Sequence, residues 1–156
     1  MLNLSMKRRF AFTLIELLVV IGIIAALTAV VFVAIDPAKR FRDSRNARRM
    51  TDVDTILAAI HQYIVDEGGA VPSGIGISAS QIGTCITGGN NLCVGATTAC
   101  VDLTTVLGNG KYLKINPIDQ QNGSEETTGY SVSRDSNNMY TVTSCSAEGT
   151  IIRGYR

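Results

Sequence analysis

One carboxylate, Glu16, stands near the start of an otherwise uncharged run of 24 residues, Phe12 to Ile35. Such a run is typical of a membrane-spanning helix, and a lone charge in hydrocarbon costs roughly 2.5–3.5 kcal/mol on insertion scales. A cationic partner would offset that cost. Glu16 is therefore a candidate functional residue whose partner is still open. On these residues alone, the simpler interpretation is that Glu16 reaches the lipid headgroups from within two turns of the helix end.

All four cysteines lie in the C-terminal part of the chain, at Cys85, Cys93, Cys100 and Cys145. An even number in a Gly/Ser/Thr-rich segment predicts two disulfides in an oxidising compartment. Three pairings are open. We favour Cys85–Cys93 with Cys100–Cys145, because the second bond would tie a loop to a late strand. Zinc is the alternative, but the spacing contains no CxxC pair and the only histidine, His61, is remote.

The remaining polar side chains form no catalytic pattern. His61 lies on a predicted helix near an apolar stripe, where packing or partial exposure is its expected role, and the glycines show no phosphate-binding pattern. Asp119, Glu125 and Glu126 share a loop whose carboxylates could hold calcium, although solvated carboxylates are the simpler interpretation. We predict no enzyme, no cofactor and no metal, with calcium at these three residues as the alternative.

The apolar run is long enough to be a retained anchor. At about 1.5 Å per residue, a helix over residues 12–35 covers the roughly 30 Å hydrocarbon core. A removed signal peptide would have a shorter apolar region and a small-x-small cleavage site, whereas Asp36-Pro37 and then Lys39-Arg40 follow this run. We therefore predict a leader over residues 1–11 and a transmembrane helix over residues 12–35.

The helix is expected to continue beyond the anchor, over residues 36–69. Pro37 should bend or briefly break it, because proline lacks the backbone donor and disfavours helical geometry at the preceding residue. Gly68 and Gly69 should end it. An apolar stripe at steps of three and four predicts one buried face: Met50, Val53, Ile56, Leu57, Ile60 and Ile64. The arginines of this segment should point elsewhere: Arg42, Arg45, Arg48 and Arg49.

Residues 70–156 are predicted to form a small β-rich head. Residues 70–110 are rich in Gly, Ser, Thr and Ala and predict a long, disulfide-pinned loop, with a short helix at Leu103–Leu107. The turn-forming residues 135–138 separate two alternating segments, which predicts a hairpin. The strand candidates are Gly129–Arg134, Met139–Ser144, Thr150–Arg153 and Lys111–Ile115. The predicted fold class is α+β, with a long N-terminal helix packed on a small antiparallel sheet.

Charge divides the chain into a basic stem and an acidic head. Residues 1–49 contain nine Lys/Arg and three Asp/Glu, whereas residues 50–156 contain five and ten. An acidic head is the wrong sign for nucleic-acid binding, so we predict no nucleic-acid partner. The opposite charges permit attraction between the stem of one copy and the head of another.

The segment around Glu16 resembles a known signal. It reads Lys7-Arg8-Arg9-Phe10-Ala11-Phe12-Thr13-Leu14-Ile15-Glu16, followed by the apolar run. This pattern closely resembles the class III signal of type IV prepilins and type II secretion pseudopilins: a basic leader, a small residue, Phe-Thr-Leu-Ile-Glu and a long apolar helix. The resemblance covers about residues 7–35. Residues 36–72 resemble the continuing family helix more loosely, and the head carries no motif that we can assign.

The resemblance implies processing and assembly. A prepilin peptidase should cut between Ala11 and Phe12 and methylate the new Phe12 amine. Ala11 stands where the family usually has glycine, and both residues are small. During assembly, Glu16 should neutralise the N-terminal amine of a neighbouring subunit. That pairing is physically sensible, because each charge alone would be costly at the end of an apolar helix.

The basic residues and the cysteines predict opposite orientations of the head across the membrane. Three basic residues precede the apolar run and six follow it between Lys39 and Arg49, so the positive-inside rule alone would place the head in the cytoplasm. The cysteines and the resemblance place the head outside, and we prefer that orientation. The arginine cluster would then lie against anionic lipid headgroups before assembly and against acidic neighbouring heads afterwards.

The expected function is that of a structural subunit. The first hypothesis is a subunit of a type IV pilus or pilus-like filament, held in the cytoplasmic membrane with an extracytoplasmic head and then displayed at the cell surface. Its partners would be copies of itself or other pilins, prepilin peptidase, an assembly platform and the membrane. The alternatives are a pseudopilin of a type II secretion system, whose filament is periplasmic, and a membrane-anchored enzyme or binding protein.

Overall fold

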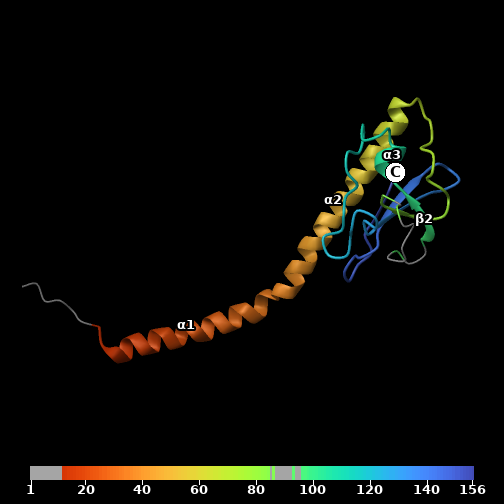
Figure 1. Cartoon of the computed structure of the whole chain (residues 1–156). Coiled ribbons are helices and arrows are strands. Elements are labelled where there is room, and N and C mark those ends of the chain that lie inside the picture. The colour runs from red at the N-terminus through yellow and green to blue at the C-terminus, as the bar shows by residue number, and fades with distance from the viewer. Residues whose placement is uncertain (1–11, 85, 87–92, 94–95) are drawn as a thin grey trace, which may run out of the picture. The chain divides into compact units, whose positions relative to one another are not determined.

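The computed structural model describes residues 12–84, 86, 93 and 96–156. The chain divides into two compact units, residues 1–41 and residues 42–156, which are described separately. Helix α1 belongs to the first unit (Figure 1). The second unit contains most of helix α2, the short helix α3 and all five strands.

Helix α1 spans Leu14–Ile35 and buries none of its residues. Its apolar side chains surround the helix on every side, so it has no polar face to turn towards water. The helical stretch at this end of the chain is long and apolar enough to cross a membrane. The predicted apolar helix is therefore present.

The helix is interrupted at Asp36, as the sequence predicted. Asp36 has a left-handed backbone conformation with φ 41°, and helix α2 then runs over Pro37–Asp66. The Asp36 carboxylate accepts a hydrogen bond from the backbone N–H of Lys39 at 3.2 Å. Pro37 fits the first helical position because the N–H that it lacks would have no partner there. The interruption thus also serves as the cap of the second helix.

Helix α2 buries one face, which only partly matches the predicted stripe. Its buried apolar residues are Val53, Ile56, Leu57, Ala59 and Ile60. Ile64 packs against their edge, but Met50 is 61% exposed, so its assignment to the stripe was wrong. The buried face includes Arg49, the residue before Met50, instead. The helix ends as predicted at Gly68 and Gly69, both with positive φ, and the Gly69 N–H donates to the Ile64 carbonyl at 2.8 Å.

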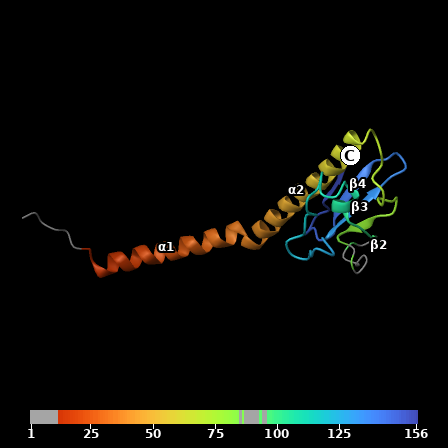
Figure 2. The same ribbon diagram turned by 45° about the horizontal axis from the view of Figure 1, so that its top comes forward.

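The five strands form one sheet in the order β2-β1-β3-β4-β5; Figure 2 labels β2, β3 and β4. The strands are β1 Ser80–Ile82, β2 Thr97–Val101, β3 Tyr130–Arg134, β4 Tyr140–Ser144 and β5 Arg153–Tyr155. All neighbours are antiparallel except β1 and β2, which run parallel. The β3–β4 hairpin confirms the prediction. Its turn is held by the Asp135 carboxylate, which accepts from the backbone N–H groups of Asn137 and Met139 at 2.8 Å each.

Other predicted elements differ. Residues 111–115 form no strand, and the last strand begins at Arg153 rather than Thr150. The region 70–110 contains β1 and β2, which the sequence analysis treated as loop. Its predicted short helix is present as α3, Leu103–Val106, and the Asp102 side chain caps it by accepting from the Thr104 N–H at 3.0 Å. The α+β class is confirmed, but the sheet is larger than expected.

The core of the head lies between α2 and the sheet. Tyr130, Val132 and Val142 contribute side chains from the middle strands, and Leu103 and Leu107 close one side. Strand β5 passes so close to α2 that a Cβ on Gly154 would lie 2.6 Å from a Leu57 methyl carbon. Glycine at this position therefore permits the contact between strand and helix.

Candidate functional site

The first site is the start of α1, where Thr13 and Glu16 cap the helix. The Glu16 Oε2 atom accepts from the Thr13 backbone N–H and from the Thr13 hydroxyl, both at 2.8 Å. In return, the Glu16 N–H donates to the Thr13 hydroxyl oxygen at 3.3 Å. This reciprocal arrangement is a capping box. Thr13 thus holds the carboxylate in place at the helix entrance.

The capping box leaves the charge of Glu16 uncompensated. Glu16 is exposed, and no basic side chain among the described residues lies within ion-pair distance of it. None of the hydrogen bonds of the described residues uses its second carboxylate oxygen, Oε1. Phe12 is 83% exposed beside it, and Ala11 lies outside the described residues. The site can therefore offer one carboxylate oxygen to a cation from outside this part of the chain.

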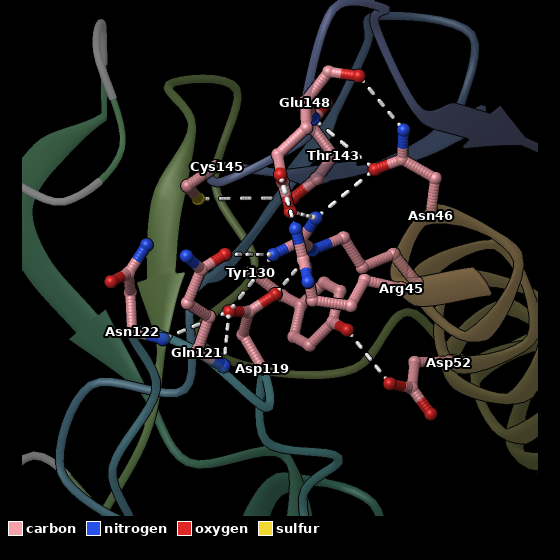
Figure 3. Close-up of polar contacts among 11 residues, drawn as sticks. Arg45, Asn46, Asp52, Asp119, Gln121, Asn122, Tyr130, Thr143, Cys145 and Glu148 are labelled. Carbon is pink, nitrogen blue, oxygen red and sulfur yellow. Dashed lines mark hydrogen bonds and ion pairs between the residues drawn. The ribbon is translucent and has the colours of Figure 1, made fainter. Parts of the chain in front are cut away.

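The second feature is a polar network that joins α2 to two loops of the head (Figure 3). Arg49 is only 2% exposed. Its Nε atom donates to Asp119 Oδ2 at 2.5 Å, and its Nη2 atom donates to Asp119 Oδ1 at 3.3 Å. Arg49 was predicted to point away from the buried face. That prediction was wrong, because a fully buried carboxylate on the loop before β3 offers Arg49 a partner.

Arg45 is also engaged within its own chain. Its Nε and Nη2 atoms donate to the two Glu148 carboxylate oxygens at 2.6 Å each. The Asn46 side chain forms two hydrogen bonds with the backbone of Glu148. Its Nδ2 atom donates to the Glu148 carbonyl at 2.8 Å, and its Oδ1 atom accepts from the Glu148 N–H at 3.1 Å. The hydrogen bonds from Arg45 are the main reason why the pKa of Glu148 falls to about 2. Of the six basic residues between Lys39 and Arg49, four remain exposed: Lys39, Arg40, Arg42 and Arg48. The cluster available to lipid or neighbours is therefore smaller than the sequence suggested.

Asp119 is therefore a structural carboxylate. Burial would raise its pKa, but the Arg49 guanidinium and the backbone N–H groups of Gln121 and Asn122 hold the pKa below its usual range. Asp119, Glu125 and Glu126 were the calcium candidates. Asp119 faces Arg49 and Glu125 is exposed, and within the described residues no three acidic, histidine or cysteine side chains gather as a metal site.

The disulfides differ from the preferred pairing. Cys93 is bonded to Cys145, with their Cα atoms 4.6 Å apart. Cys100 is also disulfide-bonded, and Cys85 lies outside the described residues. Cys100 lies on edge strand β2, whereas Cys145 directly follows β4. Three inter-strand spacings separate β2 from β4, roughly 14 Å, and a disulfide requires Cα atoms within about 7 Å of each other. The predicted Cys100–Cys145 bond was wrong because β1 and β2 were expected to be loop, and these strands hold Cys100 at the far edge of the sheet.

The N-terminal site matches a known family model. A family model for the prokaryotic N-terminal methylation motif matches residues 6–32. No curated protein and no solved structure matches the chain. The chain therefore carries a type IV prepilin-like signal, as found in pilins and pseudopilins, which are structural proteins rather than enzymes. The matched residues include Ala11, Phe12 and Glu16 and end within α1. The family model does not reach the head, so any role of the head must be inferred from the structure of the head.

Proposed function

We propose that the chain is a structural subunit of a type IV pilus or pilus-like filament. The observation that carries the proposal is a methylation motif on a helix that is apolar on all sides and buries none of its residues. Such a helix requires lipid before assembly and neighbouring helices afterwards. The head has a separate hydrophobic core within residues 42–156, which suits the surface of a fibre.

Processing would create the partner that Glu16 lacks. Prepilin peptidase would cut between Ala11 and Phe12 and methylate the new amine. The amine of one subunit would then bind Glu16 Oε1 of its neighbour, while Thr13 holds Oε2. Both charges sit at the ends of apolar helices, so each offsets the desolvation cost of the other. The capping box would thus orient the carboxylate for assembly.

The head is proposed to lie outside the cytoplasmic membrane and then on the filament surface. The Cys93–Cys145 disulfide supports an oxidising compartment. The methylation motif serves pseudopilins of type II secretion equally well. We prefer a pilus because the long cysteine-containing segment before β3 suits a surface-displayed subunit. Electron microscopy with an antibody to the head tests this choice: labelled surface filaments support it, and a head confined to the periplasm favours the pseudopilin.

The substitution Glu16→Gln tests the pairing. Glutamine at this position can still complete the capping box, so the change removes the charge and keeps the cap. We expect normal membrane insertion but a loss of filament yield of about tenfold or more, which corresponds to about 1.4 kcal/mol or more per subunit contact. The matched control, Thr28→Val, alters a polar side chain that bonds only to the Ile24 carbonyl of its own helix and should assemble normally. Normal filaments from Glu16→Gln would contradict the pairing.

Mass spectrometry tests the processing step separately. The protein in filaments should begin at Phe12 and carry one N-methyl group. Filament protein that retains Met1 would contradict cleavage at Ala11–Phe12.

A further inference from the structure

A small cavity lies beside the C-terminal half of α2, where the start of β4 and the chain after β5 meet. Its volume is about 150 Å³. Its wall includes His61, Ile64, Val71, Asn138, Tyr140 and Arg156. Tyr140 and Arg156 are held side by side by backbone hydrogen bonds in both directions, at 2.7 and 3.0 Å. The cavity is therefore built from fixed elements of the head.

Tyr140, one of the residues that line the cavity, has a buried hydroxyl group without a partner among the described residues. The residue is 3% exposed. Buried polar groups in folded proteins are nearly always hydrogen-bonded to protein, ordered water or ligand. Burial raises the pKa of Tyr140, against the smaller opposing effect of Arg134. The phenol therefore keeps its proton at neutral pH and can act as a donor.

Two arginine side chains near Tyr140 have no acidic side chain as a partner. Arg134 lies directly opposite Tyr140 in the β3–β4 pair, and its Nη1 atom donates to Asn138 Oδ1 at 2.9 Å. Its buried Nε atom forms no hydrogen bond with the described residues. Within the described part of the chain, no Asp or Glu side chain lies within ion-pair distance of Arg134 or Arg156. This is unusual on a head segment with ten acidic and only five basic residues from position 50 onwards.

The other walls are apolar. Ile64 and Val71 line the cavity together with the polar groups. An apolar cavity of roughly 150 Å³ is large enough for a six-carbon ring, so this one has room for a carboxylate and a short aliphatic stem but not for a sugar chain. Positive charge, a phenolic donor and an apolar wall together select an anion with a hydrocarbon part.

We propose that this cavity binds a carboxylate carried on a short aliphatic stem. The Tyr140 hydroxyl and the Arg156 guanidinium would donate to the carboxylate, with His61 at the rim, and Ile64 and Val71 would cover the stem. Two sources have this chemistry: a free short-chain acid, and an aspartate or glutamate side chain of a second copy of the chain. Binding of a carboxylate does not depend on the proposed filament function, because the site is complete within one head; only the choice between the two sources rests on that function.

The test uses the processed full chain in detergent micelles, with ¹³C-labelled tyrosine, titrated with sodium propionate. We expect a saturable shift of the Tyr140 ring signal. Equal concentrations of 1-propanol and of propylammonium chloride, which keep the stem and lack the negative charge, should give none. Tyr140→Phe removes only the hydroxyl, so the fold should persist. Followed through labelled arginine, this variant should bind propionate about tenfold more weakly or worse, because a charge-assisted hydrogen bond is lost.

The outcomes separate the two sources. Saturable propionate binding with normal filaments from Tyr140→Phe and Arg156→Gln assigns the site to a free acid. Binding together with reduced filament yield in both variants assigns it to a carboxylate of a neighbouring copy. A response that does not saturate, that 1-propanol reproduces or that Tyr140→Phe leaves unchanged overturns the proposal, since a cavity that holds only water would behave in this way.

Discussion

Replacing Arg49 with methionine is expected to lower the free energy of unfolding of the head by about 3–5 kcal/mol. The side chains of Arg49 and Asp119 are 2% and 0% exposed, and the guanidinium contacts both carboxylate oxygens. Methionine matches the arginine stem but leaves a buried carboxylate whose remaining partners are two backbone N–H groups. Domains of this size are usually stable by about 5–15 kcal/mol, so the loss would be a large share of the total.

The measurement is urea unfolding of the full chain in detergent, followed by the near-ultraviolet circular dichroism of tyrosine. The chain has five tyrosines and no tryptophan, and Tyr130, fully buried and bonded to Asp52 at 2.7 Å, reports on the head core. Arg48→Met is the matched control: it makes the same chemical change at the adjacent, exposed position, and it should shift stability by less than about 0.5 kcal/mol.

A double substitution tests the physical reason for the loss. Replacing both members of a buried ion pair with apolar residues is often close to neutral, because no charge is left without a partner. We therefore expect Arg49→Met combined with Asp119→Leu to be more stable than the sum of the two single changes predicts. The reasoning fails if Arg49→Met behaves like Arg48→Met, or if the two single effects simply add.

Three further results are expected. Peptide mapping without reduction should link Cys93 to Cys145, and Cys145→Ser should cost about 2–4 kcal/mol in urea unfolding; a Cys100–Cys145 peptide would contradict the structure. Because the pKa of Asp119 is lowered in the folded state, its contribution is present above the unfolded value of about 3.9 and is lost as the pH falls through the lower folded value. Thermal unfolding should therefore show a smaller loss of stability between pH 5 and pH 2 in Arg49→Met than in the parent protein. Gly154→Ala should cost about 1–3 kcal/mol through overpacking, because the added Cβ would lie 2.6 Å from a core methyl carbon, and a neutral result would refute that contact.

The sequence predicted those parts of the fold that depend on local patterns. The apolar run, the interruption at Pro37 and the glycines after α2 act within a few residues, and all three appear in the structure. The β3–β4 hairpin follows from strict alternation and a turn-forming segment. Strand β1 lacks such a signal, because its three residues, Ser80–Ile82, are buried and two of them are polar. Its position depends on distant strands, and the disulfide prediction failed with it.

Arg49 shows a different limit. Positions 49, 53, 56 and 60 follow steps of four, three and four, so Arg49 lies on the same face as the apolar stripe. The spacing therefore contained a signal for a buried arginine. Arginine is rarely buried without a partner, and the partner of Arg49, Asp119, lies 70 residues away in the sequence. The local spacing alone therefore did not predict that Arg49 is buried. An arginine on an apolar helical stripe is thus better interpreted as a prediction of a distant buried carboxylate.

The exposed apolar surface of α1 limits what can drive assembly. Moving this helix from lipid into a bundle of similar helices gains little from the hydrophobic effect, because lipid tails are as apolar as its side chains. In the proposed filament, close packing and polar contacts would therefore have to supply the preference for the assembled state. Along α1 the side chains that carry hydrogen-bonding groups are Glu16 and Thr28, and Thr28 bonds to its own helix. In the proposed filament, Glu16 would therefore be the side chain of α1 that fixes which helix end meets which neighbour, and its carboxylate would set the register of the fibre.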